Sequence, residues 1–570
     1  MLSPATWPDD EVRAILDRGQ RLEGYNPAAG AGPHGVVVGS TGPFAQYVGR
    51  RVLQAGGNAI DAAVATSCAQ ITLAVGSWVS FAGIFTLMHF DGSSREVTAL
   101  CAPFRTFAGE ADPMSIPKAP TASGRTALVP GFFAGAFAAH ERLGSLPWAE
   151  LLAPAIWLAE QGFPVDAFLA RTMRQRREVL TRTAEGRAIF TPDGADLPTA
   201  GETFRQPALA VTLRQVAEQG PSYLYTGEWA QRFCQVVQRE GGRVTPADLA
   251  SYAAVWGPPT RGEFRGCDVY GGNAPGWGGA ALIEALHMID ASGVGDPKAS
   301  PEALRWYVDI ARQTQLHSTL PAQLRTDRDF AARVVQAMRA AGGPVSPGQL
   351  FSTTHSDFVV VGDVHGSAAA VCHSTNTVFW GSTGMFVDGI SIPDAASFQQ
   401  ALLAQVAPGD LLPTPPDPNL VLRDGQLVLA SSSIGAGLHE VTVQCVAAVL
   451  SGASVQEAAD APLFHGPDYL TGDSIMSGAG DDGGTGIDAE KADSMVSHVD
   501  ALIGALLAEG TPPEDLMTSL LDRSGQVVED RFPAEVMAAA QTPRLSLRAL
   551  PADDPVVPRG HWGGIEPGPD

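Results

Sequence analysis

The chain has 570 residues, with 37 Lys and Arg against 61 Asp and Glu, which gives a formal net charge of −24. So acidic a balance argues against nucleic acid and anionic membranes as partners, because both are bound by clustered cationic side chains. Hydrophobic residues make up 45% and charged residues 17%, so the chain can bury a large core and is not of the disordered class.

The N-terminus and the cysteines point to a cytoplasmic protein. The first twenty residues lack a basic start followed by an apolar run, so we expect no signal peptide. The cysteines are scattered, with neither a C-x-x-C pair nor zinc-finger spacing to a His. We therefore expect buried thiols in a reducing compartment, and no metal or other cofactor. These cysteines are Cys68, Cys101, Cys234, Cys267, Cys372 and Cys445.

A stretch without any Asp, Glu, Lys or Arg runs from Ala62 to Phe90. It is long enough to span a bilayer, but it contains polar residues such as Gln70 and several glycines and serines. We instead predict a buried helix from Asp61 to about Ala74, with Asn58 as its N-cap. A Gly- and Ser-containing loop and a buried strand over 84–90 follow.

The next segments have helical patterns bounded by Pro and Gly. Pro246 is well placed at the start of another helix, where its missing N–H costs nothing. The predicted helices cover 134–143, 148–161, 206–219 and 228–240.

After residue 353 the pattern changes to short apolar runs separated by turns. Runs 358–361 and 368–372 predict a β-hairpin, and runs 420–422 and 426–429 predict a second one around Asp424-Gly425. A helix over 438–450 is expected next, then a surface loop over 472–490 and a solvated tail in the last twenty residues. Because strands and helices do not alternate strictly, the pattern indicates an α+β fold of stacked antiparallel sheets covered by helices.

Several sequence blocks follow one another along nearly the whole chain. They are AGGNAIDAAVATS (55–67), the segment 129–165, GGRVTPADLASYAAVW (241–256), the segment 261–286, TTHSDFVVV (353–361), AVCHSTNTVFWGSTG (370–384), and the weaker ASSSIGAGLHEVTVQCVAAVL (430–450) and DAPLFHG (460–466). Together, and in this order, these blocks resemble the γ-glutamyltranspeptidase family. The resemblance implies a four-layer αββα sandwich of the N-terminal-nucleophile hydrolase class, made as a precursor that cuts itself.

The resemblance implies cleavage between Ser352 and Thr353, with Thr353 as the new N-terminus and the nucleophile. The products are a large subunit, 1–352, and a small subunit, 353–570, of 570 − 352 = 218 residues. A free α-amine has a pKa of about 7.7–8.0, so it can act as the base for its own hydroxyl near neutral pH. We interpret His355 as structural.

Three further residues match family positions. Arg105, in APFRTFAGEA, matches an Arg that holds the substrate α-carboxylate, a task suited to a two-point guanidinium contact. Ser374 matches a hydroxyl beside the nucleophile, with Ser in place of Thr. Asn376 matches the Asn that binds the substrate amino group. Arg105 could instead be a surface residue on a loop, and Ser374 and Asn376 could be strand polar groups that are satisfied by the backbone.

Elsewhere the chain departs from the family pattern. The family's N-N-Q-M-D-D segment has no Gln here, and Asp394 alone could replace its Asp. The family's Ser-Ser pair before a proline corresponds to 414–417, and its glycine run is replaced by SWVSFAGIF (77–85). Its G-S-P-G-G turn becomes 431–435, where the backbone N–H groups of Ile434 and Gly435 could still form an oxyanion hole.

These departures leave three hypotheses. The first is a family member with a changed substrate that bears an α-carboxylate, similar to the divergent homologues of alkylproline and antibiotic biosynthesis, which cleave a C–C bond. The second is an ordinary γ-glutamyl transferase or glutathione hydrolase. The third is a non-catalytic binding protein. For the enzyme, the expected partners are a small-molecule substrate and the two subunits of one precursor, which could assemble further into a homo-oligomer.

Overall fold

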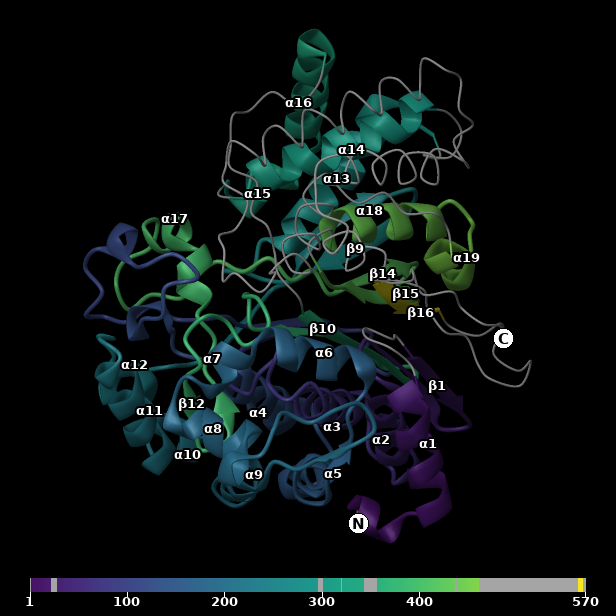
Figure 1. Ribbon diagram of the computed structural model, residues 1–570. Coiled ribbons are helices and arrows are strands. Elements are labelled where there is room, and N and C mark those ends of the chain that lie inside the picture. The colour runs from purple at the N-terminus through teal and green to yellow at the C-terminus, as the bar shows by residue number, and fades with distance from the viewer. Residues whose placement is uncertain are drawn as a thin grey trace, which may run out of the picture.

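The computed structural model describes residues 2–21, 28–295, 301–318, 320–342, 356–435, 438–460 and 562–566. Two large antiparallel sheets lie face to face, and each is covered on its outer side by helices (Figure 1). This is the expected α+β arrangement of four αββα layers. The cleavage site, Ser352–Thr353, together with His355 and the loop 472–490, lies outside the described residues.

The first sheet has seven strands and contains the hairpin predicted after residue 353. Its order is β1-β2-β10-β11-β3-β4-β7. The strands are β1 Ala28–Gly32, β2 Gly35–Gly39, β10 Ser356–Asp363, β11 Ala368–Ser374, β3 Ile84–Phe90, β4 Val97–Ala102 and β7 Val255–Gly257.

The second sheet has five strands and contains the second predicted hairpin, in the order β16-β15-β14-β9-β8. The strands are β16 Trp562–Ile565, β15 Gln426–Ser433, β14 Asn419–Arg423, β9 Cys267–Gly271 and β8 Thr260–Phe264. The prediction of a solvated tail over the last twenty residues is wrong for 562–565. Trp562 is fully buried, and β16 pairs with β15 at the edge of the sheet. Two short ribbons, β5 Phe163–Pro164 with β6 Thr203–Phe204 and β12 Phe386–Val387 with β13 Ile390–Ser391, lie apart from the large sheets.

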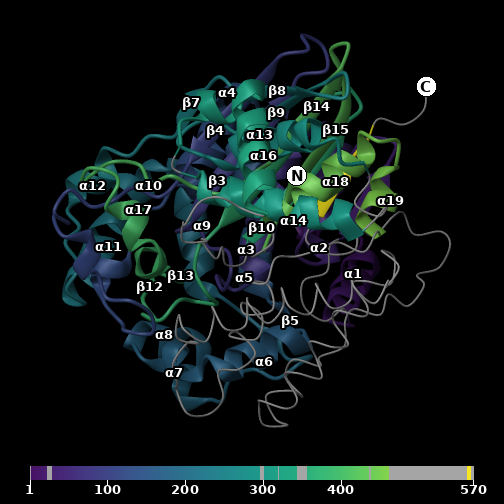
Figure 2. The same cartoon turned by 90° about the horizontal axis from the view of Figure 1, so that it is seen from above.

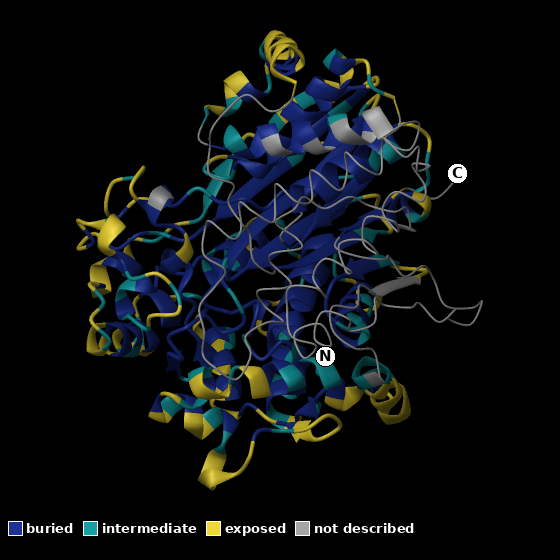
Figure 3. Cartoon of the chain, turned by 45° about the horizontal axis from the view of Figure 1, so that its top comes forward, coloured by how far each residue is buried: buried dark blue, intermediate teal, exposed yellow. Residues whose placement is uncertain are grey.

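The side chains along β10 alternate between two of the four buried hydrophobic clusters. Val359 and Val361 point into the core beneath the first helical layer, whereas Phe358 and Val360 point into the core between the sheets. Another core lies between the second sheet and its helices, and a smaller one includes Phe104 and Leu412. Figure 3 shows the buried residues concentrated in the strands at the centre of this sandwich. Even-numbered residues of β10 therefore face the second sheet.

The helices form the outer layers and the periphery, and Figure 2 looks down on the layer that contains α13, α14 and α16. Those before β7 are α1 Asp9–Arg21, α2 Pro43–Gln54, α3 Ala59–Leu73, α4 Phe132–Leu143, α5 Trp148–Gln161, α6 Ala167–Gln175, α7 Arg177–Thr181, α8 Ala184–Phe190, α9 Pro207–Gln219, α10 Ser222–Tyr225, α11 Glu228–Arg239 and α12 Pro246–Ala250. Those after β9 are α13 Gly278–Ser292, α14 Pro301–Leu316, α15 Ala322–Arg325, α16 Arg328–Ala341, α17 Gln400–Leu403, α18 Leu438–Val449 and α19 Val455–Asp460.

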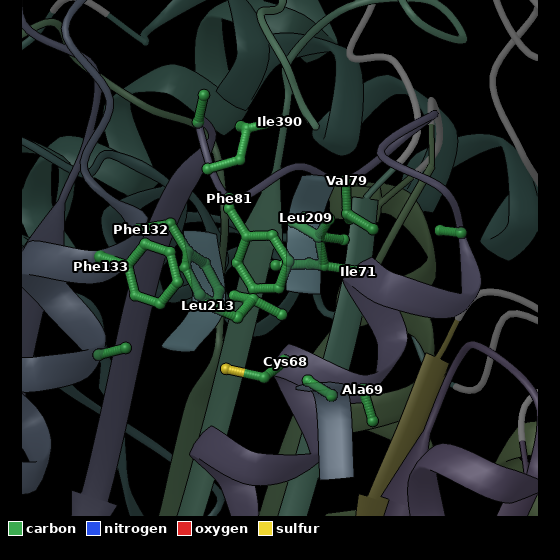
Figure 4. Close-up of a cluster of buried hydrophobic side chains, with 14 of the residues drawn as sticks. Cys68, Ala69, Ile71, Val79, Phe81, Phe132, Phe133, Leu209, Leu213 and Ile390 are labelled. Atoms are coloured by element: carbon green, nitrogen blue, oxygen red, sulfur yellow. The ribbon is translucent and has the colours of Figure 1, made fainter. Parts of the chain in front are cut away.

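Helix α3 contains the first part of the uncharged stretch that could have been mistaken for a membrane span. Asn58 caps it as predicted, accepting from the backbone N–H groups of Ile60 and Asp61, and Asp61 completes a capping box. Figure 4 shows Cys68, Ala69 and Ile71 of this helix in a cluster of buried hydrophobic side chains that also contains Phe81 and Phe132. Nearly every residue of α3 is buried inside the protein. Across the described ranges, no helix combines the length and the hydropathy that a membrane span requires.

Candidate active site

The hairpin of β10 and β11 brings two serines together at one end of the first sheet. Ser356, the first residue of β10, pairs with Ser374, the last residue of β11. The Oγ of Ser356 donates to the Oγ of Ser374 at 2.9 Å, and both side chains are buried. In the sequence, Thr353 lies three residues before Ser356. The hairpin therefore fixes Ser374 next to the start of the strand that follows the expected cleavage site.

Arg105 emerges at the same end of the sheet. Ser374 lies opposite Ile84 at the start of β3, and Phe85 lies opposite Ala102 at the end of β4. Strand β4 therefore ends level with Ser374, two strands away. Arg105 follows three residues later. The sheet register thus brings Arg105 and Ser374, predicted from separate sequence blocks, to one edge.

The Arg105 side chain already has partners within the protein. Its Nη1 donates to the carbonyl oxygen of Ser251 at 2.6 Å and to the Ser251 Oγ at 2.8 Å. Its Nε donates to the carbonyl oxygen of Gly409. The Arg105 backbone also forms antiparallel bridges to Val129 and Leu411. The guanidinium therefore connects the end of α12 to the segment 409–417, and its role toward a substrate carboxylate stays a prediction.

Residues 409–417, called the strap below, contact two of the predicted site residues and the end of β15. At one end, the strap holds Arg105, and the N–H of Leu412 donates to the carbonyl oxygen of Phe104 at 2.8 Å. In the middle, the Asn376 Nδ2 donates to the Thr414 Oγ1 at 3.5 Å. At the far end, Asp417 accepts from the Ser433 Oγ at 3.0 Å. One extended segment thus connects Arg105, Asn376 and the end of β15.

Asn376 occupies a left-handed backbone conformation, with φ of 50°, which non-glycine residues seldom adopt. Its backbone N–H donates to the Ser374 Oγ at 2.9 Å. This local bond turns the chain sharply at the end of β11. The Asn376 amide is half-buried and faces the strap, so the structure brings Ser374, Asn376 and Thr414 together.

Ile434 and Gly435 follow the last residue of β15 on the side of the second sheet that faces Ser374. The Cys372 Sγ, two residues before Ser374 on β11, lies 3.9 Å from the carbonyl oxygen of Ser433. Ile434 is fully buried between the sheets, and Gly435 has φ of 88°, a conformation that glycine adopts without strain. The predicted oxyanion turn therefore lies across the sandwich from Ser374. Its donor role stays a prediction.

Asp394 is fully buried, and its carboxylate accepts hydrogen bonds from other residues of the chain. One carboxylate oxygen accepts from the Thr377 Oγ1, and the other accepts from the backbone N–H of Ser382 at 2.8 Å. These bonds brace the turn that follows Asn376. A substrate ammonium that reached Asp394 would have to share these acceptors.

Sequence reasoning missed one titratable residue beside the site. Asp357 follows Ser356 and points to the opposite face of the sheet. Its carboxylate accepts from the Ser40 Oγ at 2.7 Å, the Thr41 Oγ1 at 2.6 Å and the Trp78 Nε1 at 3.2 Å. Burial raises the pKa of Asp357 to about 7, against the lowering effect of these hydrogen bonds. The sequence feature that could have indicated this buried carboxylate is an acidic residue directly before the apolar run FVVV (358–361).

The comparison with known sequences decides the family. The profile described as gamma-glutamyltranspeptidase matches residues 45–482, which is more than half of the chain. This chain belongs to the γ-glutamyltranspeptidase family. It is therefore an enzyme of the N-terminal-nucleophile hydrolase type, as the sequence blocks predicted.

Two curated members of the γ-glutamyltranspeptidase family are similar along most of their length. The glutathione hydrolase proenzyme of Escherichia coli (strain K12) is 28% identical over 474 residues, covering 75% of this chain and 80% of the relative. The acylase ACY 1 proenzyme of Pseudomonas sp. (strain V22) is 29% identical over 471 residues, covering 76% and 83%. Both are described as proenzymes, as expected for precursors that are processed into two subunits.

The solved structures support the same fold. A cephalosporin acylase from Bacillus halodurans matches with a TM-score of 0.65 and 22% sequence identity, covering 78% of this chain and 84% of that one. At this identity the match establishes the αββα sandwich but not the substrate. The similar proteins thus carry different names: glutathione hydrolase, acylase and cephalosporin acylase.

Proposed function

We propose that this enzyme is a self-processing acyl hydrolase or acyl transferase whose nucleophile is Thr353. The observation that carries the proposal is the convergence of Ser356, Ser374 and Asn376 at the start of β10, directly after the expected cleavage site. A buried hydroxyl pair at this point suits a strand whose N-terminal extension supplies the reacting Thr.

The proposed reaction has two steps. The α-amine of Thr353 takes the proton of its own hydroxyl, and the oxygen attacks the substrate carbonyl. The tetrahedral oxyanion is stabilised by the backbone N–H groups of Ile434 and Gly435. Collapse expels the leaving group with a proton from the amine and leaves an acyl ester on Thr353. Water in a hydrolase, or an acceptor amine in a transferase, then releases the acyl group by the reverse sequence.

The substrate we propose is a small molecule with an α-carboxylate that is not a γ-glutamyl compound. The Gln of the family pattern is missing, and both oxygens of Asp394 are hydrogen-bonded within the chain. Asn376 is then the main predicted partner for the substrate nitrogen. A secondary amine in a five-membered ring offers fewer protons than a primary ammonium, so a single amide oxygen suits it better.

An acyl-pyrroline of alkylproline biosynthesis meets these requirements, and a role in antibiotic production follows as part of the proposal. Here the leaving group is a stabilised carbanion, which takes its proton from the Thr353 ammonium as the C–C bond breaks. We place the enzyme in the cytoplasm, with the two subunits as each other's partners and the pair able to form a homo-oligomer.

The deciding experiment combines processing with substrate choice. Intact mass should show two fragments, the smaller beginning at Thr353, and Thr353→Ala should remain one chain. The mature enzyme should then hydrolyse an acyl-pyrroline carboxylate and should turn over a γ-glutamyl anilide poorly. Brisk γ-glutamyl turnover would identify an ordinary glutathione hydrolase. Failure of both electrophilic glutamine and proline analogues to label the small subunit would identify a non-catalytic protein.

A further inference from the structure

A buried carboxylate that the proposed mechanism does not use lies at the base of the oxyanion turn. Asp417, at the far end of the strap, is fully buried. Its Oδ1 accepts from the Ser433 Oγ at 3.0 Å, and its Oδ2 lies 3.4 Å from the Nδ1 of His439. Ser433 directly precedes the turn, whereas His439 is the second residue of α18. One carboxylate therefore reaches both flanks of the segment 434–438.

The two flanks are also connected to each other. The Ser433 Oγ lies 2.9 Å from the carbonyl oxygen of Leu438 and 2.5 Å from the Oγ1 of Thr442, one turn further along α18. The Thr442 hydroxyl donates to the same Leu438 carbonyl at 2.8 Å. These contacts close the end of β15 onto the first turn of α18. Ile434 and Gly435 follow Ser433 directly, so their backbone leaves β15 at this connection.

The backbone next to Asp417 is itself fixed. The Nδ2 of Asn419 donates to the Asp417 carbonyl oxygen at 3.0 Å, and the Asn419 Oδ1 accepts from the Ser431 Oγ at 2.7 Å. Asp417 is thus held between the strap and β15, and its carboxylate has little freedom to move away from Ser433.

The imidazole of His439 is held by packing. Its ring lies 4.5 Å from the ring of Trp277, centroid to centroid, at 32°. The Trp277 backbone N–H donates to the Thr414 carbonyl oxygen at 3.0 Å. Trp277 therefore contacts both His439 and the strap. Among the described residues, Asp417 Oδ2 and both ring nitrogens of His439 have no hydrogen-bond partner, and Nδ1 lies 3.4 Å from Oδ2. The approach of Nδ1 to Oδ2 is therefore the polar contact by which His439 meets the carboxylate.

This arrangement is more than a buried ion pair in the core. An isolated buried carboxylate is costly, and a well-packed apolar residue would often serve stability as well. Oxyanion donors, in contrast, act only if they are held in place before the reaction. The stretch 414–417 is also where the chain departs from the family's Ser-Ser pair, so Asp417 is not part of the inherited glutamyl-binding pattern.

We propose that Asp417 and His439 are positioning residues that clamp the Ile434–Gly435 turn from both sides and preorganise it as the oxyanion hole. The inference rests on the proposed function, because it assumes that this turn faces the reacting carbonyl. Neither residue contacts the substrate. They fix the geometry of the backbone N–H donors, so their loss should mainly reduce the stabilisation of the transition state.

The test measures kcat and KM per mole of processed enzyme for Asp417→Asn, His439→Gln and His439→Phe, using the best substrate of the wild-type enzyme. Each variant should lower kcat ten- to a hundredfold while KM changes less than threefold, since the lost stabilisation is specific to the transition state. The double variant Asp417→Asn/His439→Gln should be about as slow as the worse single one, because both residues act through one clamp. The matched control, Asp268→Asn on β9, removes a half-exposed carboxylate paired with Arg261 at the opposite end of the same sheet and should keep wild-type kcat.

His439→Phe separates the clamp from simple packing, because it keeps a ring against Trp277 and removes the polar contact. Wild-type kcat in this variant, or in Asp417→Asn, overturns the inference. So does a loss that follows the fraction of unfolded protein in thermal melting. If Asp417→Asn is not processed, the kcat values of the two His439 variants decide whether the inference holds. A wild-type protein that neither cleaves itself nor reacts with an electrophilic analogue overturns the proposed function and the clamp together, whereas an active wild type with unaffected variants overturns the clamp alone.

Discussion

Ser356 and Ser374 face each other across the β10–β11 hairpin, with their hydroxyl oxygens 2.9 Å apart in the space between the two sheets. Ser374 also accepts from the backbone N–H of Asn376. The residue expected beside the nucleophile is thus coupled to the strand that follows the cleavage site and to the amide expected to bind substrate. A change at Ser374 should affect processing and turnover together.

Ser374→Ala should slow both self-cleavage and catalysis about ten- to a hundredfold, because it removes the buried oxygen to which the Ser356 hydroxyl and the Asn376 N–H donate. Cleavage is measured as the half-time for loss of the full-length chain on a denaturing gel. Ser374→Thr, which restores the hydroxyl found in the family, should recover most of both rates. Full activity in Ser374→Ala would show that this hydroxyl has no part in the reaction.

Much of the fold could be predicted because periodicity and turn chemistry are local. Helix α5 coincides with the predicted 148–161, and α18 ends one residue before the predicted 450. The cap at Asn58 and the turn at Asp424-Gly425 were also correct, since each depends on a few adjacent residues. The predicted buried state of the cysteines is confirmed for all six.

What could not be predicted depends on contacts between distant segments. Strand β16 is four residues long and surrounded by Pro and Asp, and only its pairing with β15 buries Trp562. The strap is irregular, so no periodicity signals that it connects Arg105 to Asn376. The partners of Asp394 and Asp417 likewise come from chain positions that the sequence does not show to be close.

The C-terminal strand gives a stability prediction. Trp562→Ala should lower the free energy of unfolding by about 3–5 kcal/mol, because it removes a fully buried indole at the edge of the second sheet. Chemical denaturation of the purified protein measures this change. Phe398→Ala, at a side chain that is 39% exposed, is the matched control and should cost less than about 1 kcal/mol. A loss no larger at Trp562 than at Phe398 would show that β16 does not stabilise the sheet.

Asp357 gives a prediction about pH. Burial raises the pKa of its carboxyl group from 3.8 to about 7. Between pH 4 and pH 7 the native state therefore keeps a proton that the unfolded chain has released. Stability is highest at the acid end of this window and falls as the pH rises, by up to about 4 kcal/mol in all, because one pKa unit corresponds to about 1.4 kcal/mol. Above pH 7 the carboxyl group is ionised in both states and the loss is complete.

Asp357→Asn tests this directly, since the amide resembles the protonated acid and does not titrate. The stability of the variant relative to wild type should rise by roughly 2–3 kcal/mol from pH 5 to pH 8, measured by denaturation at each pH. Asp424→Asn, in the β14–β15 turn, should show no such change relative to wild type. A constant difference between Asp357→Asn and wild type would mean that Asp357 titrates normally.

Arg105 is the residue that we expect to bind the substrate carboxylate. Arg105→Ala should raise KM roughly ten- to a hundredfold, as expected for loss of a charge-assisted hydrogen bond worth about 1.5–3 kcal/mol. Arg105→Lys should recover little, because an ammonium cannot make the planar two-point contact. Self-cleavage should continue, since the precursor presents no free carboxylate at its scissile bond. Steady-state kinetics of the processed variants, with processing followed by intact mass, measure both effects.

Ser251→Ala is the control that the structure supplies, because Ser251 Oγ accepts from Arg105 at 2.8 Å and belongs to the end of α12. It removes one internal anchor of the guanidinium but keeps the charge available to substrate. If Arg105 binds the carboxylate, Ser251→Ala should change KM less than about threefold. If both variants raise KM equally, Arg105 acts by holding the strap to α12. In that case the substrate need not carry an α-carboxylate, and both the γ-glutamyl and the acyl-pyrroline hypotheses lose their common support.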